Sequence, residues 1–387
     1  MGDKKKLFSK KIKKINFVFK KSVPLHFIRL KVMSRVRLLV FSVVVLLSIG
    51  ESARAQDPHF SQFFANPLYL NPAYAGSVVC PRIVANFRHQ WPVTTAKWTT
   101  YSASYDQHFN AIAGGVGVLF TGDRAGAGTI NTNAFSLIYS FKADLTREVA
   151  MRIAVQATYQ QKSIDYKGAL LGDMIDPKSG FVYATKEPWE TYIKGVADFS
   201  TGIIFYSDKF YGGLAAHHIT QPNESFFYKT GKTARLPMKL SGNFGAVFDL
   251  KQHQRKEKNV GDMTISPNII FQYQNRFSKE GSASYSYLNL GMYYSVYPMV
   301  LGAWYRNGLL REKDKNSKYA PNRPDAIVFL AGIEYEFFKV GYSYDFTLPD
   351  AKTNKMKTGG AHEISAQFHL PCPVKARRVR HINCPKF

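Results

Sequence analysis

Two histidine-containing dipeptides are the features of this sequence that most resemble metal ligands. His217 and His218 are adjacent, and His362 directly precedes Glu363. Neighbouring residues of a β-strand point to opposite faces, so we expect His217 and His218 to be unable to bind one ion together. The spacing of ordinary zinc ligands does not occur in the sequence. We therefore predict no metal site.

Residues suited to hydrolysis or calcium binding are present, but their spacing matches no motif for either chemistry. A serine hydrolase needs a nucleophile, a base and an orienting group that converge, and no G-x-S-x-G elbow occurs in the sequence. Asp123, Asp173 and Asp176 fall in segments that we expect to be outer loops, without the dense acidic spacing of a calcium loop. We predict a protein that is not an enzyme and that uses no cofactor.

The N-terminal region has the pattern of an export signal. Two arginines lead into an apolar run over residues 38–49, which is too short to span a bilayer as a helix. Ala53 and Ala55 then form an A-x-A cleavage pattern, so we expect the mature chain to begin at Gln56. The mature chain contains no long apolar helix, which leaves a periplasmic protein, a secreted protein or a β-barrel.

Much of the net charge of +25 also lies in this region. Residues 1–55 contain 14 Lys/Arg and 2 Asp/Glu, or +12, which leaves 25 − 12 = +13 for the rest of the chain. No helical recognition motif accompanies that moderate charge, so we expect no nucleic-acid binding. We interpret residues 33–55 as the signal peptide and residues 1–32 as an over-extended start or a disordered basic arm. A genuine cytosolic basic arm is the alternative.

The three cysteines allow more than one disulfide, and export permits disulfides to form. One pairing joins Cys372 to Cys384 and closes a short basic tail. Alternatively, Cys80 pairs with either of them, which requires the two chain ends to be neighbours. In each case one thiol stays unpaired or bonds to another chain.

Apolar and polar residues alternate with a period of two through most of the mature chain. In residues 151–160, Met151, Ile153, Val155, Ala157 and Tyr159 alternate with mostly polar residues, a pattern that places the two sets on opposite faces of a strand. The chain is also rich in aromatic residues, at 14%. The pattern predicts an all-β fold with about fourteen antiparallel strands over residues 81–370. The predicted strands lie near residues 81–90, 97–107, 114–122, 129–142, 148–161, 196–207, 210–219, 238–250, 263–276, 284–296, 298–307, 325–336, 338–347 and 360–370.

The connections between these segments alternate between short and long. Short connections are expected around 110, 143–147, 207–209, 297–298 and 337, whereas 162–195, 221–237, 308–324 and 348–359 are long and polar. Outer-membrane barrels have short periplasmic turns and long outer loops. We therefore predict a transmembrane outer-membrane β-barrel with a basic periplasmic tail over residues 371–387. A soluble β-sandwich is the alternative, because alternation alone does not distinguish a core from lipid.

Charged residues on the polar face are predicted to meet inside the barrel. The cations are Arg82, Arg88, Lys142, Arg152 and Lys239, and the anions are Asp106, Asp198, Asp249, Glu334, Glu336, Asp345 and Glu363. Such residues either pair and fill the interior or line a transport path. We favour a filled lumen, because the segment that follows the signal is available to plug it. The basic tail is either a solvated segment or a docking site for an acidic protein or for lipid headgroups.

The segment that follows the signal, residues 56–80, has the most specific sequence of the chain. It begins QDPHFSQFFANPLYLNPAYAGS and combines two Asn-Pro turn formers with several aromatic residues. We interpret it as a plug or periplasmic cap that precedes the first strand. Its candidate partner-binding or plug residues are Gln56, Asp57, Pro58, Phe60, Gln62, Phe63, Asn66, Pro67, Asn71, Pro72 and Gly76.

This segment closely resembles the start of the PorP/SprF family, outer-membrane proteins of the type IX secretion and gliding system of Bacteroidota. Arg88 to Pro92 resembles the family's RxQWP element, Tyr101 to Asp106 its second strand, and Gly114 to Gly128 its glycine-rich stretch. His362 to Ser365 resembles its closing HEIS strand, so the resemblance extends from about residue 56 to the C-terminus.

The resemblance implies that the chain helps to export and attach cell-surface proteins such as gliding adhesins. The partners it implies are the periplasmic ring and other type IX secretion proteins, a secreted adhesin as cargo, and outer-membrane lipid. A passive porin-like solute channel is the alternative function.

Overall fold

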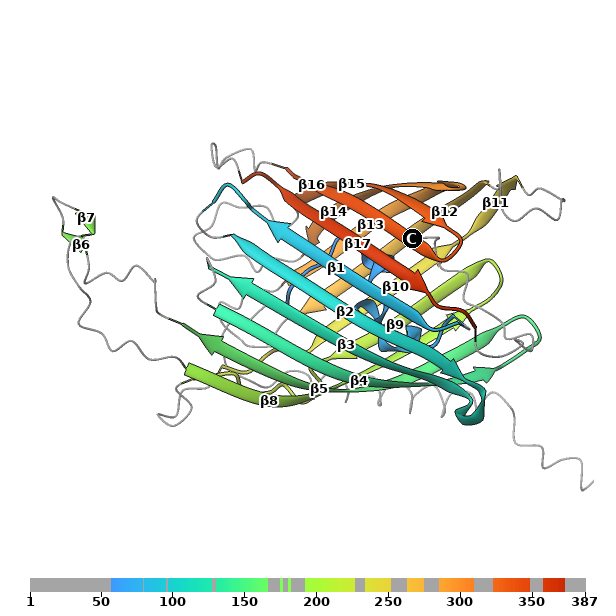
Figure 1. Ribbon diagram of the computed structural model, residues 1–387, viewed down its shortest axis with the longest axis horizontal. Coiled ribbons are helices and arrows are strands. Elements are labelled where there is room, and N and C mark those ends of the chain that lie inside the picture. The colour runs from blue at the N-terminus through green and yellow to red at the C-terminus, as the bar shows by residue number, and fades with distance from the viewer. Residues whose placement is uncertain are drawn as a thin grey trace, which may run out of the picture. The chain divides into compact units, whose positions relative to one another are not determined.

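In the computed structural model, the segments with alternating apolar and polar side chains are strands that form a closed antiparallel β-barrel (Figure 1). The structure describes residues 57–78, 80–94, 97–126, 130–165, 175–176, 180–181, 192–226, 234–251, 263–274, 285–309, 323–348 and 358–372. The chain divides into two units, Met1–Gly50 and Glu51–Phe387, and the first lies outside the described residues. The predicted signal peptide, Gln56 and the tail beyond 372 also lie outside them.

The wall consists of strands that are hydrogen-bonded in one continuous sheet. They are β1 (Arg82–Gln90), β2 (Trp98–Phe109), β3 (Gly114–Ala125), β4 (Ile130–Asp144), β5 (Ala150–Ile164), β8 (Tyr192–Tyr206), β9 (Phe210–His217), β10 (Lys239–Ala246), β11 (Phe248–Lys251), β12 (Met263–Gln274), β13 (Tyr285–Val296), β14 (Met299–Leu309), β15 (Arg323–Tyr335), β16 (Phe338–Thr347) and β17 (Ala361–His369). Two short strands, β6 (Ile175–Asp176) and β7 (Gly180–Phe181), form a separate hairpin in the connection between β5 and β8.

Two pairings close the barrel. The first strand pairs with the last, in the register Arg82↔His369 through Gln90↔Ala361. On the far side β10 pairs with both β9 and β12. Because β10 and β11 both pair with β12, they are two parts of one interrupted strand. The described residues therefore form the fourteen-stranded antiparallel barrel that the alternation predicts.

The barrel is apolar outside and polar inside. In β1, Arg82, Asn86 and Arg88 point inward and are buried, whereas Ile83 and Phe87 are 40% and 47% exposed. Many large apolar residues of the other strands are exposed in the same way, whereas others, among them Tyr211, Tyr293 and Trp304, point inward and are buried. An outer surface of this kind suits lipid, and a polar interior is usual for outer-membrane barrels.

The connections at the two ends of the barrel differ in length as predicted. At one end, 110–113, 145–149, 207–209, 297–298 and 336–337 are short, and 252–262 is the longer exception. At the other end, connections include 165–191, 218–238 and 348–360, although 126–129 is short. In outer-membrane barrels the short turns lie at the periplasmic end and the long connections at the outer end, so the two ends are named in this way below. No helix in the described part of the chain has the length and apolar character needed to cross a membrane.

A disulfide joins Cys80 to Cys372, with their Cα atoms 4.6 Å apart. The expectation that Cys372 pairs with Cys384 is therefore wrong. The reason is topological: β1 pairs with β17, and the two cysteines lie just beyond the Arg82↔His369 end of this pairing. The alternative in which the chain ends are neighbours is the observed arrangement, and Cys384 lies outside the described residues.

Candidate functional site: the luminal plug

Residues Asp57–Ser77, called the plug below, lie in the lumen of the barrel (blue in Figure 1). Three short helical turns fold this segment: η2 (Phe63–Ala65), α3 (Pro67–Leu70) and η3 (Pro72–Tyr74). Each Asn-Pro pair starts a turn, because proline lacks the N–H that the first helical position leaves unbonded. Asn71 also accepts a hydrogen bond from the Ala73 N–H at 2.9 Å.

Aromatic side chains fix the middle of the plug. The Phe63 ring lies 5.0 Å from the Trp304 ring of β14, measured between centroids. The Phe64 ring makes edge contacts with Tyr211 of β9 at 5.8 Å and Tyr293 of β13 at 6.2 Å. Because these rings belong to strands on different parts of the wall, the plug fills the interior that a barrel of this size would otherwise leave open.

A buried ionic cluster holds the plug toward the outer end. The Ser61 hydroxyl donates to Asp345 Oδ2 at 2.6 Å, and the Ser61 N–H donates to Glu363 Oε2 at 2.7 Å. Arg88 pairs with Asp345 at 2.8 Å and with Glu363 at 3.1 Å. Arg306 also pairs with Asp345, at 2.9 Å. None of these five residues, called the Ser61 cluster, is more than 6% exposed, so each charge depends on its partners for compensation.

Gln62 extends this attachment along β17. Its N–H donates to Glu363 Oε1 at 3.1 Å, and its side-chain amide donates to the Glu363 carbonyl at 2.9 Å. The Ser365 hydroxyl donates to Gln62 Oε1 at 2.6 Å. Gln62 is fully buried, and these bonds satisfy both ends of its amide.

A second polar cluster holds the plug at the periplasmic end. Arg82 donates two hydrogen bonds to Asp106, at 2.8 Å and 3.0 Å. The same carboxylate accepts from the Gly76 N–H at 2.8 Å. Arg152 and Ser140 donate to the Ala75 carbonyl at 3.0 Å and 2.6 Å. The wall therefore satisfies the plug's backbone just before the chain enters β1.

A third cluster holds the first described residue. Asp57 Oδ2 lies 2.9 Å from His218 Nε2 and 3.3 Å from Lys239 Nζ. His218 Nδ1 lies 2.8 Å from Asp198 Oδ2. Burial disfavours the charged form of His218, but the two carboxylates outweigh it and raise its pKa to about 10. Burial opposes the Asp57 charge as well, yet His218 and Lys239 hold the pKa of Asp57 well below its usual range.

Wall glycines make room for the plug. A Cβ on Gly115 would lie 2.4 Å from the Ala75 carbonyl oxygen and 2.6 Å from the Gly76 Cα atom. A Cβ on Gly202 would lie 2.0 Å from Asn71 Oδ1. Asn71 uses this space to donate to the Ile203 and Leu214 carbonyls at 3.3 Å and 3.2 Å. Part of the glycine-rich sequence in β3 is thereby explained by close contact with the plug.

The plug residues singled out in the sequence are brought together in the lumen, apart from Gln56, which lies outside the described residues. Phe60 packs edge-on against Tyr69, whose hydroxyl donates to the Pro58 carbonyl. Asn66 donates to the Ser102 hydroxyl at 2.7 Å. Several predicted luminal ions pair as expected, including Arg82 with Asp106 and Arg88 with Asp345.

Sequence reasoning missed two participants of the Ser61 cluster, Ser61 and Arg306. Arg306 lies two residues after the buried Trp304 in β14, so its side chain points inward as well. The period-two alternation of this strand could therefore have identified Arg306 as a luminal residue. The expectation that His217 and His218 face apart is wrong. His218 lies past the end of β9 with φ +57, and both side chains line one cavity.

Asp123 belongs to β3 rather than to a loop, Asp176 lies in the short strand β6, and Asp173 lies outside the described residues. Within the described part of the chain, no group of three His, Cys, Asp or Glu side chains is arranged to hold a metal ion.

Residues 52–368 match the family model described as "Type IX secretion system membrane protein PorP/SprF". The chain belongs to the PorP/SprF family. As a member of the PorP/SprF family with an outer-membrane barrel fold, it is a membrane protein of type IX secretion and is located in the outer membrane. No curated protein sequence matches this PorP/SprF chain.

The structure of this PorP/SprF protein is similar to three solved structures. The Ralstonia pickettii toluene transporter TbuX has a TM-score of 0.42 and 9% identity, over 79% of this chain and 93% of that chain. A Pseudomonas aeruginosa FadL homologue has a TM-score of 0.39 and 11% identity, over 77% and 92%. The Acinetobacter baumannii protein Omp33 has a TM-score of 0.36 and 8% identity, over 76% and 100%.

Proposed function

We propose that this protein supports the export or surface attachment of proteins such as gliding adhesins, and that it acts by binding protein partners. The single observation that carries the proposal is the attachment of the plug through the lumen by the Ser61 cluster. A barrel whose interior is occupied by its own bonded chain is suited to act as a scaffold. In this proposal the protein catalyses no reaction.

The two ends of the barrel have different roles in the proposal. The short turns and the basic tail face the periplasm and meet the ring proteins of the secretion system. The long connections, such as 165–191 and 218–238, face outward and meet the adhesin. Family membership supports an association with secretion components, and the difference in loop length supports the assignment of the two ends.

The proposal is tested by affinity purification of the tagged protein from gently solubilised outer membranes, followed by mass spectrometry. We expect periplasmic ring proteins and a large surface adhesin to be recovered with the wild type. A variant in which residues 57–77 are replaced by a Gly/Ser segment of equal length should lose the adhesin from the purification and from the cell surface. Val155→Ala provides the matched control, because Val155 is 59% exposed on the outer face of β5, away from both ends of the barrel.

Recovery of a lone, heat-modifiable barrel would contradict the proposal. So would normal adhesin secretion by the plug-replacement variant, once its insertion in the outer membrane has been verified. A lone barrel that also conducts ions would favour the passive solute channel.

A further inference from the structure

The neighbouring strands β8 and β9 reach different heights at the outer end of the barrel. Their pairing runs to Thr201↔Ala216, and β9 ends one residue later, at His217. β8 extends well beyond this point, because it starts at Tyr192. On its other side, β5 pairs with β8 over the whole length of β8. The outermost part of β8 therefore has a paired strand on one side only.

The unpaired side of β8 presents the backbone N–H and C=O groups of alternate residues. The Phe199 carbonyl faces this side, where it accepts a hydrogen bond from the Ile219 N–H at 3.0 Å. Because backbone groups alternate between the two sides of a strand, those of Ile193, Gly195 and Ala197 face the same way. In the described part of the chain, these groups meet no partner strand and form no hydrogen bond. The three residues are called the free edge below.

The free edge lies in water above the apolar band of the wall. Ile193 is 63% exposed. The outward residues beside it and beside Gly195 on β5 are Ser163 and Gln161, and Asn133 of β4 continues the same polar row. Polar residues on the outward face mark the part of a barrel that stands beyond the hydrocarbon. Unpaired backbone groups are tolerated only there, because lipid offers them no hydrogen bond.

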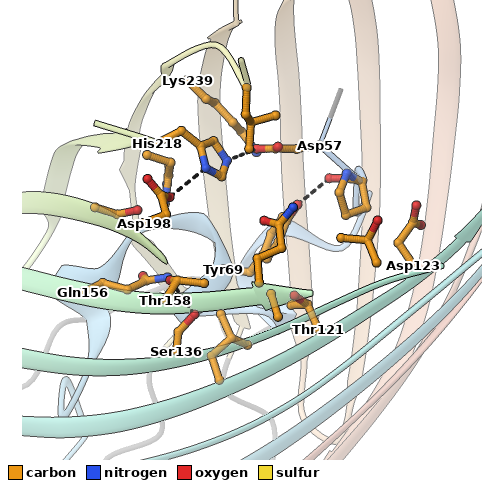
Figure 2. A pocket seen from close by; sticks show the side chains of 18 of the residues that line it. Asp57, Tyr69, Thr121, Asp123, Ser136, Gln156, Thr158, Asp198, His218 and Lys239 are labelled. Atoms are coloured by element: carbon orange, nitrogen blue, oxygen red, sulfur yellow. Dashed lines mark hydrogen bonds and ion pairs between the residues drawn. The ribbon is translucent and has the colours of Figure 1, made fainter. Parts of the chain in front are cut away.

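The chain that leaves β9 turns into the lumen and does not follow the free edge. Figure 2 shows His218 between Asp57 of the plug and Asp198 of β8, at 2.9 Å and 2.8 Å. Further along, Glu224 pairs with Lys162 of β5 at 2.8 Å and is only 4% exposed. The described part of this connection therefore occupies the mouth of the lumen and leaves the free edge uncovered.

The free edge also lacks the features by which proteins protect an unpaired strand. Such features include proline, charged side chains and β-bulges. β8 contains no proline, the three residues of the free edge are uncharged, and the register with β5 is regular. An exposed and regular edge is suited to strand addition, in which an extended segment of another protein pairs with the backbone.

A second copy of this chain does not fit the free edge. Two copies in one membrane have the same orientation, so a two-fold axis along the membrane normal relates them. Barrel strands are tilted by about 35–45°, so two β8 strands related by this axis cross at roughly 70–90°. Strands that cross at such an angle form no ladder. An extended segment of a different protein is free to take the direction that pairing requires.

We propose that the free edge binds an extended segment of the secreted surface protein, which adds to the barrel wall as an antiparallel strand beside β8. The backbone of the segment bonds to the N–H and C=O groups of Ile193, Gly195 and Ala197. Its outward side chains lie beside Ile193 and Phe199, which are 63% and 54% exposed. The inference rests on the proposed function, because it identifies the surface of the outer end that holds the adhesin.

The test removes one N–H group of the free edge and leaves the pairing of β8 with β5 in place. Ala197→Pro does this, because the N–H of residue 197 faces away from β5 and proline is tolerated where the N–H of a strand faces solvent. Tagged wild type and variant are purified from gently solubilised outer membranes, and the recovered adhesin is quantified by mass spectrometry. We expect recovery to fall about tenfold or more. Val155→Ala, on the outer face of β5, should recover the adhesin like the wild type.

Hydrogen exchange provides a second measurement that needs no variant. In the purified complex with the adhesin, the amides of Ile193, Gly195 and Ala197 should exchange more slowly than in the barrel alone. Equal exchange in the two samples overturns the inference. So does full recovery of the adhesin by Ala197→Pro, once heat-modifiability on gels verifies that the variant is folded.

The same purification separates this inference from the proposed function. Adhesin that is recovered equally by the wild type and by Ala197→Pro contradicts strand addition alone. A wild type that recovers no adhesin contradicts the proposed function, and the inference with it. Loss of an untagged second copy of the chain, rather than of the adhesin, from the Ala197→Pro purification would assign the free edge to self-association and overturn the inference.

Discussion

At the scale of single residues, Asp345 is the buried carboxylate that compensates two luminal arginines. It is 1% exposed and pairs with both Arg88 and Arg306. Asp345→Asn should destabilise the barrel by about 3–5 kcal/mol, because it leaves two buried guanidinium groups with one carboxylate fewer. The measurement is the urea midpoint of the purified protein. Asp144→Asn removes the exposed partner of Lys142 and should cost no more than about 1 kcal/mol. Equal midpoints for the two variants would contradict this account.

We expect the attachment of the plug to depend on pH, because His218 titrates there. Because its pKa is raised from 6.5 to about 10, its contribution to stability is complete below pH 6.5 and is lost as the pH rises through 10. Asp57, whose pKa is lowered, contributes above its ordinary value of 3.8 and loses that contribution as the pH falls. The free energy of unfolding should therefore fall between pH 6.5 and 10 by up to about 1.4 kcal/mol per pH unit, and the thermal midpoint, which is the measurement, should fall with it.

The His218→Gln variant isolates this effect. Its midpoint should be lower than that of the wild type at pH 6.5, and the difference should shrink toward pH 10. A decline of equal slope in both proteins would show that another group titrates.

At the scale of elements, the fit between the plug and β3 depends on Gly115. Gly115→Ala places a methyl group against plug backbone that cannot rotate away. We expect faster hydrogen exchange over residues 60–77 and a lower thermal midpoint. Gly242→Ala is the control, because its Cβ would meet a Leu214 side-chain atom at 3.3 Å and no backbone atom closer than 4.0 Å. Unchanged exchange in Gly115→Ala would mean that the plug does not need this close contact.

The strands could be predicted from the sequence because their signal is local. Each inward and outward face repeats every two residues, so Met151 to Gln160 identifies β5 without any knowledge of its neighbours. The interruption between β10 and β11 was not predicted, because it lies at one residue, Val247, within an otherwise alternating segment.

The partners of the plug could not be predicted in the same way. Ser61 and Glu363 are separated by 302 residues, and the period of a strand says nothing about which residues meet across a lumen. The prediction of the disulfide pairing was wrong for the same reason, because the pairing depends on β1 lying next to β17. The segment itself was identifiable, because its Asn-Pro pairs and aromatic residues stand apart from the alternating strands.

At the scale of the whole molecule, Cys80–Cys372 ties together the first and last strands at the end where the plug enters the wall. Cys80→Ser should destabilise the barrel by roughly 2–5 kcal/mol, as removal of a native disulfide often does. Denaturant midpoints with and without reductant measure the effect, and reductant should not change the variant. Cys384→Ser is the control and should keep the wild-type midpoint. A midpoint for the wild type that does not respond to complete reduction would contradict the prediction.

The last prediction concerns ion conductance and follows from the closed lumen. Two cavities, of about 100 and 160 Å³, flank Asp57 and Pro58, but the Ser61 cluster and the aromatic contacts of Phe63 and Phe64 lie across the interior. We expect the wild type to be silent in planar bilayers. Replacing residues 57–77 by a flexible Gly/Ser segment should produce open-channel currents, because fourteen strands enclose more space than the remaining inward side chains fill. The Val155→Ala variant should stay silent. Large steady currents from the wild type would show that the plug leaves a path and would favour the solute channel over the scaffold.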